Sequence, residues 1–401
     1  MPTPSIEQPE YCPNPSCRFY DRSIADSHLW YYRHGSFHTN ARGTIERFRC
    51  RSCGKCCSTQ TFSIHYWTHS TNDLVWLLHL LYSRSGLRQI SRFAGCAYRV
   101  IENRIRRVAR NSLAVMDAVF ENLELQEDLT MDGLESYTRS QYHPNNFTTI
   151  VGSDSQFLYS VVHTLLRRSG RMTDRQKAMR GLIDMVWKPP RSALRSDCQS
   201  MLHDMAPSMV AAAQRRGQLR IYTDEHNAYP KAIRGVRQLA EQTQVGRLVH
   251  HRTNSRKRRT KTNPLFAVNY VDRQMRKNMG EHVRETITQG REVNCQMERM
   301  AVFMVLHNFF TPHRIGDRVD GRSYPSRGEC AGLQTPRVRS TIRRYLTHRH
   351  IYGHCRGKQE WIRRVWKHAY ETPPVVRVRQ GLFVGRSVAM QATEMPAYLT
   401  A

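Results

Sequence analysis

The chain has 401 residues, 39% of them hydrophobic, with 62 lysines and arginines against 33 aspartates and glutamates. This length and composition predict a packed core in roughly two to three domains. The formal charge of +29 predicts a polyanionic partner, because like charges repel one another in a compact chain. Nucleic acid fits best, since neutralising phosphates releases counterions. A membrane surface is the rival, but the cations are spread over the whole length and the longest apolar stretch, at 73–82, is too short to span a bilayer.

The N-terminal stretch MPTPSIEQPEYC lacks the basic and then apolar pattern of a secretory signal, so we expect a cytoplasmic protein. In that compartment the eleven cysteines are expected to be metal ligands or free thiols rather than disulfides. Composition divides the chain into four predicted parts. They are a cysteine-rich segment at 1–66, a helical segment at 67–125, a mixed strand and helix segment at 126–310, and a basic C-terminal extension at 311–401.

Six of the eleven cysteines lie in the first segment, in a pattern that predicts a zinc ribbon. Cys12 and Cys17 flank a Pro-rich turn, and Cys50 and Cys53 form a C-x-x-C pair followed by a glycine. Four thiolates from two such pairs are the ligand set of a structural zinc site, and the stretch LWYYRHGSFH between the pairs suits a hairpin. The wide gap in the first pair and the competing thiols of Cys56 and Cys57 leave free cytosolic thiols as the alternative.

The second segment predicts a helix-turn-helix. The residues TND at 71–73 favour a helix start before an apolar run, and two further helices flank a turn at Gly95. In the last helix, apolar residues recur at helical spacing and basic residues lie largely off that stripe, as in a helix that enters a major groove. An ordinary helical hairpin with a solvated basic face is the alternative. The predicted DNA contacts on this helix are Arg99, Asn103, Arg106 and Arg107.

In the third segment, residues 129–166 read as three consecutive strands, and LRIYT at 219–223 reads as a fourth. Asp132 sits within the first strand, and Asp224 follows the fourth. Three antiparallel strands, a helical excursion and a further strand make the order of a ribonuclease-H-like fold with a mixed sheet, in which the first and fourth strands are neighbours. We therefore expect Asp132 and Asp224 to face one another and to bind Mg²⁺ or Mn²⁺. For either aspartate alone, a cap or turn role is the alternative.

A third acid is expected from the following helix, which we predict to begin at Asn263 and Pro264. Asp272 shares a helix face with Asn269 and Arg276. Glu285 would point away from that face if the helix were unbroken, but Gly280 could reset the phase. Asp272 is therefore the first choice and Glu285 the reserve.

These stretches resemble bacterial insertion-sequence transposases of the DDE type, in the branch with a zinc ribbon, a helix-turn-helix and a ribonuclease-H-like core. The resemblance covers about residues 10–310. The stretches that carry it are FRCRSCGK, DGLESYTRSQYHP around Asp132, LRRSGRMTDRQK, TDEHNAYP around Asp224, the HHRTNSRKRRTKTNPLFAVNYVD run, HVRETI and ERMAVFMVLHNFF. The family's third acid is usually glutamate, often in an H-x-N-x-x-E-like setting, whereas this chain has Asn269 and Asp272 there.

The resemblance implies movement of a DNA element, with double-stranded DNA ends and target as partners, a homo-oligomer, and a cytoplasmic, nucleoid-associated location. A basic run before the third-acid helix is expected to grip phosphates without reading sequence, or else to be a solvated loop. Its predicted contacts are Arg256, Lys257, Arg258 and Arg259. The alternatives to a transposase are a non-catalytic DNA-binding regulator derived from one and a metal-dependent nuclease of the same fold.

Overall fold

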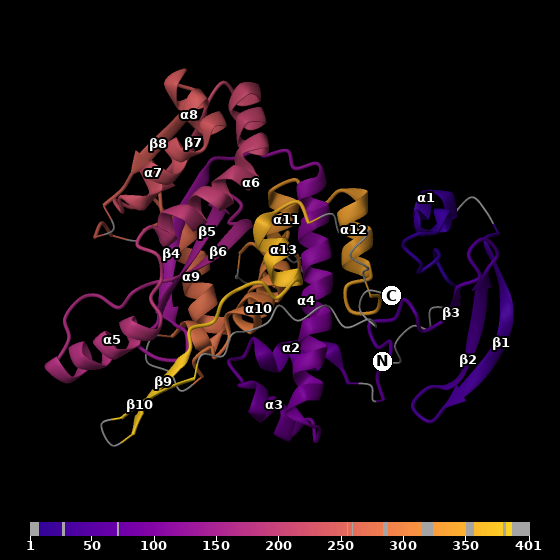
Figure 1. Ribbon diagram of the computed structural model, residues 1–401. Helices are drawn as coiled ribbons and strands as arrows, with labels where there is room; N and C mark the ends of the chain where they lie inside the picture. Colours follow the sequence, from indigo (N-terminus) through magenta and orange to yellow (C-terminus); the bar gives the residue numbers. More distant parts are fainter. Residues whose placement is uncertain are drawn as a thin grey trace.

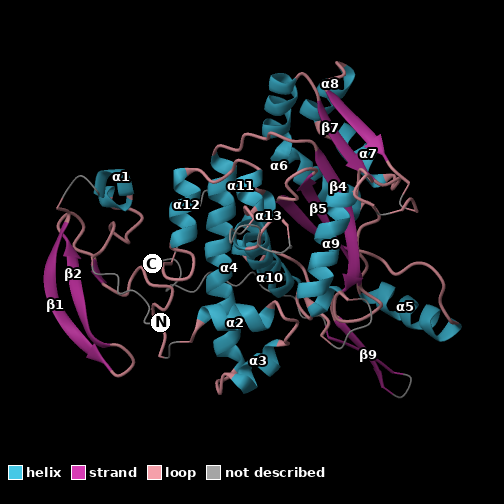
Figure 2. Cartoon of the chain, turned by 180° about the vertical axis from the view of Figure 1, so that it is seen from behind, coloured by secondary structure: helices cyan, strands magenta, loops and turns pink. Residues whose placement is uncertain are grey.

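The computed structural model describes residues 8–25, 29–69, 72–254, 256–258, 260–283, 288–314, 324–349, 357–379 and 382–386. Within them the chain is a multi-domain α/β protein with two separate hydrophobic clusters, one among residues 11–62 and a larger one among residues 64–370. Figure 1 shows the small N-terminal sheet on one side of the long helix α4 and the five-stranded sheet on the other, and Figure 2 shows the same arrangement from behind. No helix in the described ranges combines the length and the apolar character needed to cross a membrane.

The N-terminal unit is a three-stranded antiparallel sheet in the order β1-β2-β3, next to two short helical turns. The stretch LWYYRHGSFH, predicted to suit a hairpin, forms one strand of a hairpin, β1, whose second strand is β2. The elements are η1 (Arg18–Tyr20), α1 (Arg22–Ala25), β1 (Tyr31–Thr39), β2 (Gly43–Cys50) and β3 (Cys56–Ser58). Its aromatic core includes Tyr11, Trp30, Phe48 and Phe62, all buried.

Three helices follow, α2 (Leu74–Leu81), α3 (Leu87–Phe93) and α4 (Tyr98–Glu121). Asp73 caps α2 by accepting a hydrogen bond from the Trp76 amide at 3.1 Å. The turn between α3 and α4 contains Gly95 in the left-handed region at φ +58°. Helix α4 is 24 residues long and is buried along most of its length, from Ile101 to Val119.

The larger sheet has five strands in the order β6-β5-β4-β7-β8. The three predicted consecutive strands are confirmed as an antiparallel meander, and the prediction that the first and fourth strands are neighbours is confirmed by the parallel pairing of β4 with β7. Strands β7 and β8 are also parallel. The bounds are β4 (Leu129–Tyr137), β5 (Pro144–Gly152), β6 (Leu158–Leu165), β7 (Leu219–Thr223) and β8 (Leu248–Arg252).

Strands β5 and β6 are buried at nearly every residue, since helices cover both faces of this sheet. Helix α6 packs on β6 and β7, and α9 packs on β4 and β5. Helix α9 begins two residues later than predicted and ends before Gly280, the residue that could reset the helix phase. The bounds are α5 (Asp174–Val186), α6 (Ala193–Arg216), α7 (Ala228–Gly235), α8 (Arg237–Gln244), α9 (Phe266–Asn278) and η2 (Gly280–His282).

The C-terminal segment packs into the main core. Trp361, Ile362, Val365 and Trp366 are all buried, and α12 and α13 contact α4. The large cluster therefore runs continuously through positions 125 and 310, where the sequence divided the chain. The elements are α10 (Val293–Val305), η3 (Leu306–Phe310), α11 (Arg327–Cys330), α12 (Pro336–Arg343), α13 (Glu360–Trp366), β9 (Val375–Arg379) and β10 (Leu382–Arg386).

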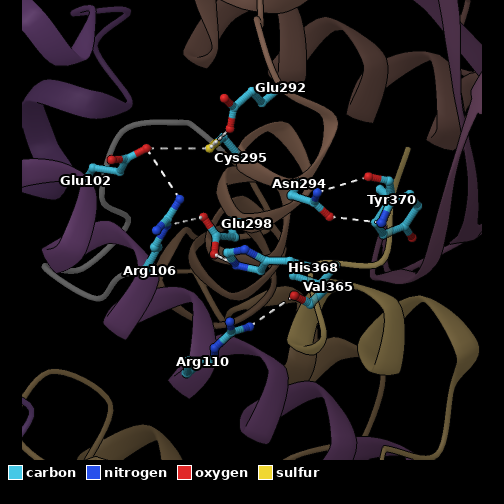
Figure 3. A network of polar contacts seen from close by, with 10 residues as sticks. All are labelled: Glu102, Arg106, Arg110, Glu292, Asn294, Cys295, Glu298, Val365, His368 and Tyr370. Carbon is cyan, nitrogen blue, oxygen red and sulfur yellow. Dashed lines mark hydrogen bonds and ion pairs between the residues drawn. The ribbon is translucent and has the colours of Figure 1, made fainter. Parts of the chain in front are cut away.

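A buried polar network joins α4, α10 and the end of α13 (Figure 3). Glu298, only 1% exposed, pairs with His368 Nε2 at 2.7 Å and with Arg106 Nε at 3.5 Å. Asn294 bonds the backbone of Tyr370 twice, each time at 3.0 Å. Burial raises the pKa of Glu298, but the hydrogen bond from His368 and the nearby positive charges outweigh it, so the pKa is lowered. The carboxylate is thus held charged inside the protein.

Two basic side chains of α4, Arg107 and Arg110, are buried, although the sequence predicted that they lie off the core stripe. Arg107 is 5% exposed and donates to Asn103 Oδ1 at 2.7 Å and to the Ile64 carbonyl at 2.9 Å. Arg110 is also buried, and it donates to the Val365 carbonyl and lies over the Trp366 ring. The prediction that Arg107 projects from the core stripe is therefore wrong: neighbouring segments surround α4 and take up its guanidinium groups.

We predict that Glu298→Ala lowers the free energy of unfolding by about 2–4 kcal/mol, because it leaves the half-buried Arg106 and His368 without the buried carboxylate that pairs with both. Glu102→Ala is the matched control. It removes a partly exposed carboxylate from the same Arg106 and should cost no more than about 1 kcal/mol. Urea unfolding near pH 7 measures both. The loss should shrink as the pH falls toward and below about 4.3, the usual value for glutamate, because the parent then loses the charge as well. Equal costs for the two variants would contradict a dominant role for Glu298.

Candidate catalytic site and metal centre

Four cysteines of the N-terminal unit meet at one point. Cys12, Cys17, Cys50 and Cys53 have their Sγ atoms all within 4.8 Å of one another, with Cys12 and Cys53 3.4 Å apart and Cys17 and Cys50 3.8 Å apart. Two tight turns produce this convergence. Cys17 N donates to the Asn14 carbonyl, and Gly54, at φ +71°, donates its N–H to the Cys50 carbonyl.

The quartet fits a zinc ion by its donor chemistry and its size. Tetrahedral Zn–S bonds of about 2.3 Å place the sulfurs about 3.8 Å apart, close to the observed separations. The four thiols could therefore hold structural zinc, as the sequence predicted. The two competing thiols lie outside the quartet, because Cys56 and Cys57 belong to strand β3. A bound ion would supplement the small aromatic cluster beneath the ribbon.

The two central aspartates lie at corresponding points of adjacent parallel strands. Met131 is the partner of Thr223 in the β4–β7 register, and Asp132 and Asp224 are the next residue of each chain segment. Both side chains are half-buried. The Thr223 hydroxyl donates to the Asp224 carbonyl and also contacts His250 Nε2 at 2.8 Å, which ties the end of β7 to β8.

The buried phenol of Tyr229 on α7 lies near the predicted acids. Its side chain is 2% exposed, and its pKa is raised well above the ordinary value, first by burial and then by Asp132, Cys198, Asp224 and Asp272. All three predicted acids therefore lie near enough to this phenol to act on its charge. The sequence analysis missed Tyr229, although it stands in the TDEHNAYP stretch.

The adjacent acids Asp224 and Glu225 have different environments. Asp224 accepts a hydrogen bond from the His226 amide at 2.8 Å, whereas the Glu225 side chain is exposed. Arg252 at the end of β8 donates to the Glu225 carbonyl and to Asn227 Oδ1. The neighbouring strand β8 thus fixes the loop after β7. Asp224 is therefore the member of the pair that faces the site.

Gly133, next to Asp132, leaves room for the Asn146 side chain of β5 to lie against strand β4. A Cβ atom at Gly133 would lie 2.3 Å from Asn146 Nδ2, so no other residue fits without movement. Asn146 is itself fixed by the Thr148 hydroxyl at 2.7 Å, and the Gly133 amide donates to Asp132 Oδ1 at 2.7 Å. These contacts orient the Asp132 carboxylate.

Among the described residues the cysteine quartet is the only group of three or more metal-ligating side chains whose ligand atoms all lie within 4.8 Å. The three carboxylates are therefore spaced more widely than the four thiols. Glu285, the reserve third acid, lies outside the described residues.

The predicted DNA contacts differ in exposure. Arg99, at the second position of α4, is exposed, as are Arg256, Lys257 and Arg258 before α9. Arg106 is partly exposed and paired with Glu102 and Glu298, and Asn103 accepts from the buried Arg107. Arg259 lies outside the described residues.

The sequence analysis also missed a basic projection. Helix α5 extends away from the body next to the β9–β10 hairpin (Figure 1), and only Ile183 of its residues is buried. Arg171, Arg175 and Lys188, on or beside this helix, are exposed. The signal was the LRRSGRMTDRQK stretch, whose cations outnumber its single acid.

Comparison with known protein families, with curated proteins and with solved structures found no match to this chain. The functional argument therefore depends on the geometry and chemistry of the residues described above.

We predict that Cys50→Ser abolishes binding of the N-terminal zinc and exposes the amides of β1 and β2 to hydrogen exchange, because a hydroxyl is a poor substitute for a thiolate ligand. Cys56→Ser, a change six residues away at a thiol outside the quartet, should keep the metal. Metal content of the purified full-length chain and exchange of the ribbon amides measure both effects. Retention of zinc by Cys50→Ser, or its loss in Cys56→Ser, would show that the ligand set is different.

Proposed function

We propose that this protein is a DNA transposase that binds the ends of an insertion sequence and performs metal-dependent strand cleavage and strand transfer. The observation that carries the proposal is the proximity of Asp132, Asp224 and Asp272 to Tyr229, from two adjacent parallel strands and a helix packed on them. Carboxylates that converge in an otherwise strongly cationic chain suit divalent metals and a phosphodiester substrate.

The sheet supports the same proposal. Three antiparallel strands are followed by two parallel ones, and the central strand carries the first acid. This order, with helices on both faces, supports a ribonuclease-H-like core. It also explains why the acids come from distant parts of the sequence, since the site forms only when β7 adds to the edge of the meander.

The residues that would hold Mg²⁺ or Mn²⁺ are Asp132, Asp224 and Asp272. When bound, such ions activate an attacking oxygen and stabilise the leaving oxygen of a phosphoryl transfer. The chain's own contribution is orientation. The Gly133 amide fixes Asp132, the His226 amide fixes Asp224, and packing of α9 on β4 and β5 supports the inclusion of Asp272. This scheme requires no serine, cysteine or histidine nucleophile.

Double-stranded DNA is the proposed partner, both as the ends of the element and as the target. The proposed location is the cytoplasm, in association with the nucleoid. The formal charge of +29 and the exposed cations Arg99, Arg256, Lys257 and Arg258 support it through phosphate contacts. Helix α5 adds a further exposed basic surface. Holding two ends in one complex requires more than one copy of the chain, so we propose a homo-oligomer.

A non-catalytic DNA-binding regulator is the second candidate, and one observation favours it. The three carboxylates are not gathered within 4.8 Å as the four thiols are. In that case the acids would serve only as structural residues of the core. A metal-dependent nuclease of the same fold is separated from a transposase by the fate of the cut end, which is either hydrolysed or joined to a target.

We predict that Asp224→Asn and Asp132→Asn each lower the rate of strand transfer by about a thousandfold or more, because several kcal/mol of transition-state stabilisation is lost with a metal ligand. The assay uses purified protein, Mg²⁺ and duplexes that carry the DNA ends from the native locus, and it scores cleaved and joined strands separately. DNA affinity should change little.

Glu225→Gln is the matched control, because it removes the adjacent but exposed carboxylate and should leave the rate unchanged. Strand transfer by Asp224→Asn at the parent rate would contradict the metal-ligand role. A parent protein that binds the ends without cutting them would establish the regulator, and one that cuts without joining would establish the nuclease.

A further inference from the structure

A cavity of about 920 Å³ lies outside the proposed catalytic site, between the tip of the β1–β2 hairpin, strand β3 and the segment at 60–69 that leads to α2. Its size is within the range of about 300–1,000 Å³ that is usual for small-molecule sites. The proposed function gives this cavity no role.

Exposed aromatic side chains stand among the residues that line this cavity. Trp67 is 72% exposed and Phe37 is 42% exposed. The backbone of Trp67 has φ +55°, in the left-handed region that a bulky side chain rarely adopts. The chain therefore keeps an indole in water at an unfavourable backbone conformation, which packing of the core does not require.

One wall of the cavity is built in advance. Arg42 donates to Gln60 Oε1 at 3.1 Å, to the His65 carbonyl at 3.5 Å and to Thr68 Oγ1 at 3.2 Å. The Thr68 hydroxyl in turn donates to the His65 carbonyl at 2.7 Å. These bonds tie the hairpin to the segment that carries Trp67, so the cavity does not depend on a ligand for its shape.

Two buried polar atoms of lining residues have no hydrogen-bond partner in the described part of the chain. They are Nδ1 of His65, whose side chain is 3% exposed, and Oγ1 of Thr39. Burial, helped by Arg104, Arg42 and Arg107, lowers the pKa of His65 to about 4, so the imidazole is neutral near pH 7. Leaving such atoms unpaired is costly, and a turn of either side chain toward the cavity would let a polar ligand edge satisfy them.

The charge of the cavity is positive. Its lining contains Arg42 and Arg47 but no aspartate or glutamate among the described residues. The Arg47 guanidinium makes no hydrogen bond or ion pair within the described ranges. A ligand that suits this cavity has a flat aromatic body, a polar edge and an anionic group.

We propose that the cavity binds one unpaired nucleotide of a DNA strand. The base lies against Trp67, its polar edge meets His65 and Thr39, and its phosphate lies near Arg47. Stacking on an aromatic side chain tolerates any base, and basic groups track the backbone. The cavity would thus recognise a frayed or overhanging nucleotide next to a duplex held by the exposed cations of the chain. This step rests on the proposed function only for the duplex that presents the nucleotide.

The test compares binding of the zinc-loaded full-length chain to a blunt duplex and to the same duplex with a short single-stranded overhang, by fluorescence anisotropy. The parent should bind the overhang duplex roughly tenfold more tightly or better, as expected for stacking of one base. Trp67→Ala should abolish this preference and keep the affinity for the blunt duplex, and Trp67→Phe should keep most of the preference. Trp76→Ala, which removes another exposed tryptophan outside the cavity, is the matched control.

Three results would overturn the inference. They are equal binding of the two duplexes by the parent, an unchanged preference in Trp67→Ala, and binding of a free deoxynucleoside monophosphate as tight as that of the overhang. In each case, blunt-duplex binding and strand transfer by the parent would leave the proposed function intact. A parent that binds no DNA would contradict the proposed function itself.

Discussion

The parallel pairing of β4 with β7 is the constraint on which the candidate site depends. It fixes Met131 opposite Thr223 and so sets the two following aspartates side by side. Nothing local in the sequence holds these residues together, since helices α5 and α6 lie between the two strands. Closing so long a loop costs conformational entropy, which is offset by burying α6 against β6 and β7 and by the continuous core around them.

The same pairing explains the surroundings of the site. β7 pairs with the edge of the meander and β8 pairs with β7. Because β7 and β8 are parallel, the loops that follow them lie at the same end of the sheet. Arg252 at the end of β8 therefore reaches the loop after β7. Helix α7 begins directly after that loop, and this brings Tyr229 near the carboxylates. Strand order thus brings together groups that their sequence positions separate.

Much of the sheet could be predicted from the sequence, because strands β4 to β7 are rich in β-branched and aromatic residues and are bounded by turn residues. The four clustered thiols could also be predicted, since a ribbon requires paired cysteines. The burial of Arg107 and Arg110 could not. A helical stripe of apolar residues reveals one buried face, whereas α4 is enclosed by α10, α12 and α13, which lie far away in sequence.

The C-terminal core escaped prediction for a related reason. Helix α13 has only seven residues, too few to show a periodic pattern, yet Trp361, Ile362, Val365 and Trp366 all enter the core. Tyr229 and the cavity beside Trp67 depend on contacts between separate segments. A local pattern carries no signal for such contacts, and each residue taken singly looks ordinary.

Helix α4 has a mechanical consequence. Its 24 residues span about 36 Å. The exposed first turn carries Arg99, and the rest of the helix packs against α10, α12 and α13. Packed interiors resist compression, so a tilt imposed at the exposed tip has to move α10 and α13 with it. A force applied at the exposed start of α4 is therefore transmitted along the helix to the C-terminal helices packed against it.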